Sequence, residues 1–111
     1  MLDAATIEHV MPQTLTEEWQ NMLAADGDPK KTHDLLLDTI GNLTITAYNP
    51  ELSNLAFQEK KKIYSSSHYS LNEWFAACPD WSAKQIEERA RDLWERAKVI
   101  WPAPIPLSVP L

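Results

Sequence analysis

The sequence predicts an α+β fold, a mostly helical domain around a two-stranded antiparallel hairpin that is followed by a helix. Residues 43–46 alternate apolar and polar side chains as a half-buried strand does, and residues 7–10 are read as another short strand, with Ile7 and His9 on one face and Glu8 and Val10 on the other. The roughly thirty residues between them must carry helices of their own to stay compact. Near the end of the chain, apolar residues recur at three- and four-residue steps over residues 83–100, which indicates a long amphipathic helix.

Length and composition indicate a single packed domain. The chain has 111 residues, 44% of them hydrophobic, with five tryptophans. We place the domain at residues 1–101 and treat residues 102–111, which contain four prolines and no charge, as a proline-rich tail. The net charge of −6 argues against a free-standing, tight nucleic-acid binder, because phosphate contacts need lysine and arginine. It leaves open a catalytic module that another domain delivers to DNA.

The cysteine count and the hydropathy pattern limit the cellular setting. Cys78 is the single cysteine, so neither an internal disulfide nor a cysteine-based zinc site can form. No apolar run approaches the roughly 18 residues of a membrane span, and no signal-peptide pattern opens the chain. We therefore expect a soluble, cytoplasmic protein with no membrane partner.

Two short helices are expected between the strands. Thr14 and Glu17 have the spacing of a capping box and would open the first, which ends at the Gly-Pro turn in residues 26–29. Thr32 would cap the second helix. Gly41 would end it in a left-handed conformation.

The second half of the chain reads as further helices. One is expected to run to about Tyr64, capped by Ser53 or Asn49, with capping boxes at Ser70 and Ser82 opening two more.

Charge and aromatic patterning add two expectations for these helices. In the last one, Arg89, Arg91 and Arg96 alternate with acidic residues, which predicts a salt-bridged outer face. The tryptophans are expected in the core.

The chemistry of the chain is concentrated around His9. This histidine follows Glu8 in the first strand, which Pro12 would end. An imidazole titrates near neutral pH and suits a general base that removes a proton from water. Mg²⁺ prefers carboxylate and amide oxygens, so Glu8, or a carbonyl beside it, and an asparagine from the following helix are candidate ligands.

Several separated motifs carry a resemblance to a known family. They are Glu8–Gln13, Leu37–Thr44, Asn49, Ser53–Tyr64 and the closing run Ile86–Trp101. Together they resemble the C-terminal domain of GmrSD-type restriction endonucleases, a His-x-x-Pro domain that belongs to the HNH, or ββα-metal, nucleases. The resemblance covers about residues 7–101.

This resemblance implies a Mg²⁺- or Mn²⁺-dependent DNA endonuclease or nickase, attached behind a nucleotide-hydrolysing domain and directed against foreign or modified DNA. Carried over by position, His9 resembles the general base, Glu8 the acidic residue beside it, and Asn42 the middle asparagine that braces the hairpin. Asn49 and Asn54 compete for the place of the helix-borne metal ligand. The cysteine pairs of many HNH proteins are missing, so no structural zinc is expected.

Plainer interpretations stay open for several of these residues. Lys60, Lys61 and Lys62 would either neutralise DNA phosphates or form a solvated helix face. Glu8 would either bind metal or pair with a lysine. The rival for the whole chain is a non-catalytic docking module that has kept the HNH-like fold, which the acidic net charge favours.

Overall fold

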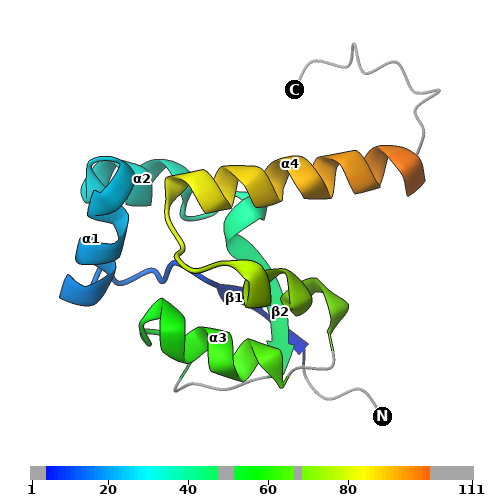
Figure 1. Cartoon of the computed structure of the whole chain (residues 1–111), viewed down its shortest axis with the longest axis horizontal. Coiled ribbons are helices and arrows are strands. Elements are labelled where there is room, and N and C mark those ends of the chain that lie inside the picture. The colour runs from blue at the N-terminus through cyan, green and yellow to red at the C-terminus, as the bar shows by residue number, and fades with distance from the viewer. Residues whose placement is uncertain (1–4, 48–51, 67–68, 101–111) are drawn as a thin grey trace.

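The computed structural model describes residues 5–47, 52–66 and 69–100 and confirms the α+β class (Figure 1). Helices surround one two-stranded sheet. The elements in chain order are β1 (Ala5–His9), α1 (Glu17–Leu23), η1 (Ala24–Asp26), α2 (Pro29–Leu36), η2 (Ile40–Asn42), β2 (Leu43–Ala47), α3 (Phe57–Ser65), η3 (Ser70–Ala77) and α4 (Ala83–Ile100), where η marks a 3₁₀ helix.

The hairpin lies at the centre of the molecule. Strands β1 and β2 pair antiparallel, as predicted, with Ile7 opposite Ile45 and His9 opposite Leu43. In Figure 1, α4 runs along one side of the hairpin, α3 lies on the other, and α1 and α2 gather at one end. The order strand, strand, helix expected around the site is therefore present.

The buried face of the sheet carries threonines, whereas its exposed face is apolar. Thr44 and Thr46 point inward and are buried, whereas Ile7 is 70% exposed on the opposite face. The Thr44 hydroxyl donates to the side-chain oxygen of Asn72 in η3, whose amide donates to the Ile45 carbonyl at 3.0 Å. The open face of the hairpin is thus the apolar one.

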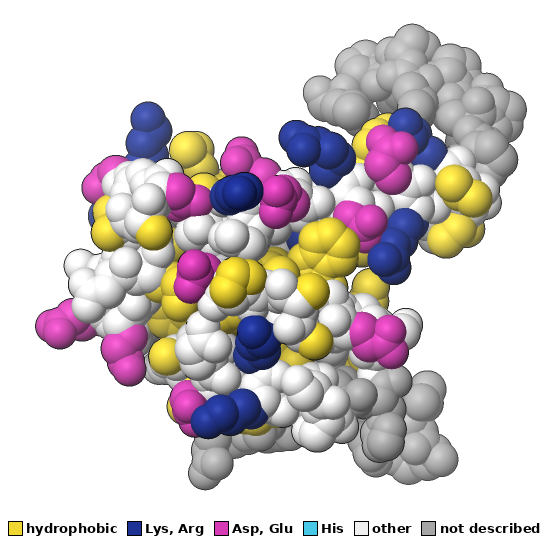
Figure 2. All heavy atoms as spheres, in the orientation of Figure 1, with side chains coloured by type: hydrophobic (Ala, Val, Ile, Leu, Met, Phe, Trp, Pro, Cys, Tyr) yellow, Lys and Arg dark blue, Asp and Glu magenta, His cyan; other side chains and the backbone are white. Residues whose placement is uncertain are grey.

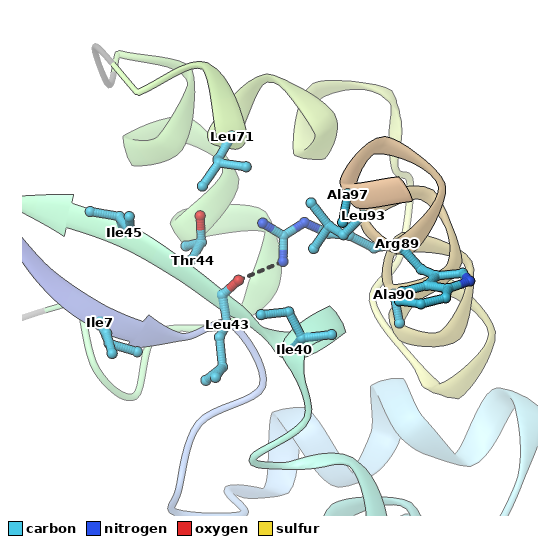
Figure 3. A pocket seen from close by; sticks show the side chains of 11 residues that line it. Ile7, Ile40, Leu43, Thr44, Ile45, Leu71, Arg89, Ala90, Leu93 and Ala97 are labelled. Atoms are coloured by element: carbon cyan, nitrogen blue, oxygen red, sulfur yellow. Dashed lines mark hydrogen bonds between the residues drawn. The ribbon is translucent and has the colours of Figure 1, made fainter. Parts of the chain in front are cut away.

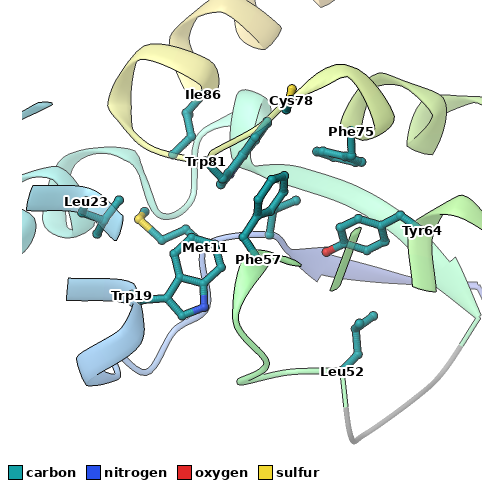
Figure 4. Close-up of a cluster of buried hydrophobic side chains, with 11 residues drawn as sticks. Met11, Trp19, Leu23, Leu52, Phe57, Tyr64, Phe75, Cys78, Trp81 and Ile86 are labelled. Carbon is teal, nitrogen blue, oxygen red and sulfur yellow. The ribbon is translucent and has the colours of Figure 1, made fainter. Parts of the chain in front are cut away.

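Aromatic side chains dominate the core (Figure 4). The Trp81 ring lies 5.7 Å from that of Phe57 and 5.0 Å from that of Phe75 between centroids. Trp19 is also fully buried, as predicted. The core prediction is wrong for Trp94, which is 51% exposed on α4.

The helix starts differ from those predicted. Thr16, rather than Thr14, accepts the capping bond of α1, from the Trp19 amide. Helix α2 begins earlier than predicted, because Asp28 accepts from the Lys31 amide and a proline occupies its first position. Thr32 is instead a buried residue inside α2.

Helix α3 begins later than predicted, at Phe57, after Ala56, which makes no side-chain capping bond. Ser53 therefore does not cap it, and Asn49 lies outside the described residues.

Gly41 serves close packing instead of a left-handed turn. Among the described residues the positive φ belongs to Gly27, and Gly41 lies inside η2. A Cβ added at Gly41 would stand 2.1 Å from the backbone oxygen of Ile86 in α4. Only a residue without a side chain allows η2 and α4 to approach this closely.

The last helix spans the predicted residues, but Arg89 does not lie on its outer face. Arg89 is 1% exposed, and its Nη1 donates to the carbonyls of Gly41 at 3.1 Å and Leu43 at 2.6 Å. Its guanidinium also lies 4.9 Å from the Phe75 ring centroid. Burial lowers the pKa of Arg89 to about 10. The outer-face prediction holds for Arg96, which pairs with Asp92 at 2.9 Å.

Within the three described ranges, no helix combines the length and the apolar character needed to cross a membrane.

Candidate active site

His9 is the last residue of β1 and lies where the hairpin meets the end of α2. Its Nε2 is 2.9 Å from Oδ1 of Asp38, which follows α2 in the chain. The His9 side chain is 22% exposed, so a substrate can reach it. The residue after His9 stays paired, since the Val10 amide donates to the Asn42 carbonyl at 2.9 Å.

Asn42 is a buried brace between two loops. Its Oδ1 accepts from the Met11 amide at 2.8 Å and from the Trp81 indole at 3.0 Å. Its Nδ2 donates to the carbonyls of Met11 and Leu37, each at 2.9 Å. With two bonds accepted and two donated, the side chain has no capacity left for a substrate. Asn42 therefore holds its neighbours in place, which is the kind of contact that the expected bracing role needs.

Glu8 points to the opposite side of β1 and meets α3. Its Oε2 accepts from Lys60 Nζ at 2.8 Å and from the Tyr64 hydroxyl at 2.9 Å. Lys60 Nζ donates a second bond to the His9 carbonyl at 2.8 Å. The lysine side chain is completely buried, and this burial lowers its pKa against the opposing effect of Glu8. These three side chains form a clamp that attaches α3 to the strand carrying His9.

A comparison with family models identifies the family of the chain. The model described as GmrSD restriction endonucleases, C-terminal domain, matches residues 2–96. The chain belongs to this family. It is a nuclease domain of a restriction system, a class of enzyme that acts on DNA, and as a C-terminal domain it implies an N-terminal partner domain. No curated protein and no solved structure matches it.

The basic patch predicted for this GmrSD domain is not assembled on its surface. Lys60 is buried in the clamp, so it cannot contact DNA, and that prediction is corrected. Lys61 Nζ donates to the Cys78 carbonyl at 2.6 Å. Lys62 is 75% exposed and pairs with Glu59 at 3.2 Å. One of the three lysines therefore stands open to solvent.

The predicted metal ligands do not converge in the described part of the GmrSD domain. Glu8 already has the Lys60 ammonium as its cationic partner. Asn54 lies in the exposed turn before α3 instead of on that helix, and Asn49 lies outside the described residues. No group of three or more His, Cys, Asp or Glu side chains among the residues described is arranged to hold a metal ion. These residues by themselves do not fit a divalent-ion site.

Beside His9, the open face of the GmrSD hairpin continues into an apolar groove against α4 (Figure 3). The groove encloses about 470 Å³ and is lined by eleven residues, among them Ile7, Leu43, Ile45, Leu93 and Trp94. His9 pairs with Leu43 across the strands, so its side chain lies on this same face of the sheet. His9 is not itself one of the residues that line the groove.

Asp38 is the site residue that sequence reasoning missed. It lies 29 positions from His9, and no local motif links the two. The pairing of β1 with β2 and the position of η2 bring them together, so the signal appears only once the fold is known.

Proposed function

We propose that this domain is an HNH-type endonuclease or nickase that hydrolyses a DNA phosphodiester with His9 as the general base. The observation that carries the proposal is the placement of His9. It ends the first strand of a strand–strand–helix unit in a restriction endonuclease family, within reach of solvent and beside the Asn42 brace.

In the proposed reaction, His9 accepts a proton from a water molecule that attacks phosphorus in line with the leaving oxygen. The backbone on both sides of His9 is held by buried groups. Lys60 binds the His9 carbonyl, and Asn42 binds both polar atoms of the Met11 backbone. Such fixed placement matters because a positioned base contributes about 10²- to 10⁴-fold to the rate.

A requirement for Mg²⁺ or Mn²⁺ is part of the proposal and rests on the resemblance to HNH nucleases. A divalent ion supplies the positive charge that phosphodiester hydrolysis needs. Since Glu8 is held by Lys60 and Tyr64, we expect Asn49 or Asn54 to matter more than Glu8 for metal affinity. No structural zinc is proposed, because the chain has a single cysteine.

DNA delivery is assigned to another part of the restriction system. The chain carries a net charge of −6, and its lysine run leaves one side chain open to solvent. We propose that an upstream nucleotide-hydrolysing domain or subunit brings DNA to residues 1–101, and that the protein works in the cytoplasm.

A plasmid-nicking assay tests the proposed function. Supercoiled DNA is incubated with the chain, alone and fused to the N-terminal domain of a GmrSD enzyme, with Mg²⁺, with Mn²⁺ and with a chelator. We expect relaxed or linear plasmid to form with metal and not with the chelator. Absence of cleavage by the fused protein with both metals would contradict the proposal.

The second candidate function is a non-catalytic docking module, and the apolar groove favours it. Ile7, Ile40 and Trp94 are each more than half exposed around that groove. The nicking assay separates the two functions, because a docking module leaves the plasmid supercoiled in every lane.

A further inference from the structure

We infer that Asp38 is a positioning residue for His9, which keeps the ring in the tautomer with hydrogen on Nε2 and leaves Nδ1 as the proton acceptor. The inference rests on the proposed function, since it names the atom through which His9 acts.

The chemistry of the contact fixes the position of the hydrogen. An ionised carboxylate accepts hydrogen bonds and has none to donate. His9 Nε2 lies 2.9 Å from Asp38 Oδ1, a normal hydrogen-bond distance, so Nε2 must carry the hydrogen. In a neutral imidazole the lone pair then lies on Nδ1. Nδ1 is the nitrogen closer to the backbone, which the clamp and the brace hold in place.

The brace explains how residues far apart in sequence meet at this distance. The Asn42 amide donates to the Leu37 carbonyl, one residue before Asp38, and to the Met11 carbonyl, two residues after His9. The Thr39 hydroxyl, on the other side of Asp38, donates to a carbonyl of α2 at 2.8 Å. One buried side chain thus ties the backbone beside the base to the backbone beside the carboxylate.

Because Asp38 is exposed, its effect on the position of His9 can be tested without unfolding the protein. Its side chain is 81% exposed, and pairs this exposed contribute little to stability because water and salt screen them. Replacing Asp38 should therefore leave the protein folded while it frees the imidazole to change tautomer and to rotate. Asp34 on α2 offers a matched control, since it is also exposed and pairs with Lys30 at 3.0 Å.

The test combines ¹⁵N NMR of the histidine rings with cleavage kinetics, in the wild type, Asp38→Ala, Asp38→Asn and Asp34→Ala. We expect His9 in the wild type and in Asp34→Ala to show the Nε2–H tautomer. Asp38→Ala should give a mixture of tautomers, and so should Asp38→Asn, because a side-chain amide can either accept from a protonated Nε2 or donate to a bare one. In the fused nuclease, Asp38→Ala should lower kcat by about tenfold or more with little change in KM.

The outcomes distinguish this inference from the proposed function. If the wild type cleaves DNA and the His9 tautomer is the same in Asp38→Ala, the inference fails and the proposed function stands. If the tautomer changes but kcat does not, the positioning role is overturned. If the wild type does not cleave, the proposed function fails and the catalytic role of Asp38 fails with it, while the NMR spectra still report whether the hydrogen bond exists.

Discussion

At the scale of single residues, Asn42 has the largest structural effect in the site. It is fully buried and joins the end of β1, the end of α2 and the Trp81 indole through four hydrogen bonds. In a protein interior each of these partners would be left unsatisfied if the amide were removed.

Asn42→Ala should therefore lower the free energy of unfolding by about 3 kcal/mol or more, because two donors and two acceptors lose their partner. Urea denaturation followed by tryptophan fluorescence measures the change. Asn54→Ala, in an exposed turn, is the control and should stay within about 0.5 kcal/mol of the wild type. A loss below about 1 kcal/mol for Asn42→Ala would show that the brace is not structural.

Two of the predicted site residues have local sequence signals. His9 and Asn42 lie in short motifs, and the structure places both beside the end of the hairpin. The prediction for Lys60 is wrong because a run of three lysines suggests an exposed surface, whereas Lys60 is buried. The spacing of its neighbours nevertheless indicated a buried position. Phe57, Lys60 and Tyr64 lie at i, i+3 and i+7, and all three are buried on one face of α3.

At the scale of elements, the clamp of Glu8, Lys60 and Tyr64 determines how α3 meets β1. Lys60 is fully buried and Glu8 is 12% exposed, so each charge depends on the other. Removal of one partner from such a pair destabilises more than removal of both, because the remaining charge stays buried.

Lys60→Met should lower the free energy of unfolding by about 3 kcal/mol or more, since it leaves the Glu8 carboxylate without its cation. The double variant Glu8→Gln with Lys60→Met removes both charges and should recover part of this loss. Chemical denaturation of the wild type, both single variants and the double variant gives the coupling. Additive effects of the two substitutions would contradict a coupled pair.

The Tyr64 hydroxyl gives the same clamp a pH dependence. Burial, and then the negative charge of Glu8, raise the pKa of Tyr64 well above its usual value. In the unfolded chain the phenol ionises near pH 10, so above that pH the folded state retains a proton that the unfolded state has lost. The contribution of the hydroxyl is therefore complete below about pH 10 and is lost as the pH rises further.

A comparison of the wild type with Tyr64→Phe isolates this effect. The lowered pKa of Lys60 acts in the opposite direction, but Lys60 is present in both proteins. We expect the stability advantage of the wild type over Tyr64→Phe to shrink as the pH rises from about 10 to about 11. A difference that stays constant over this interval would show that the phenol ionises freely in the folded protein.

Helices and strands were predictable where the spacing of apolar residues is regular. The starts of helices were not predictable where capping residues were the sole signal. Strand β2 and the full extent of α4 follow from apolar spacing. The polarity of the hairpin faces did not follow, because the buried Thr44 hydroxyl is satisfied by Asn72 in η3, a contact between distant segments. The role of Gly41 was likewise hidden, since it depends on the approach of α4.

At the scale of the whole molecule, the charge distribution argues that this domain does not bind DNA strongly by itself. On the face drawn in Figure 2, basic and acidic side chains are interspersed and form no basic stripe, while hydrophobic side chains gather between α4 and the elements below it. This agrees with the net charge of −6 and with the loss of Lys60 from the predicted patch. These observations support the proposal that a partner domain brings the DNA.

The fold class and the family followed from the sequence because several separated motifs agree on them. The site followed only in part. The proposed base and its brace lie in those motifs. The contacts of Asp38 and of the Lys60 clamp join residues at least 29 positions apart, and the groove is formed by several separate segments of the chain. Such contacts have no signature in a single sequence.

Chemical rescue of a His9→Ala variant is the most direct test that His9 accepts the proton during DNA cleavage. In the fused nuclease with Mn²⁺, His9→Ala should cleave plasmid about 10²- to 10⁴-fold more slowly than the wild type, and its thermal unfolding should be nearly unchanged. Added imidazole should restore part of the rate in the variant and none in the wild type. Cleavage by His9→Ala at the wild-type rate would contradict the assignment of His9 as the base.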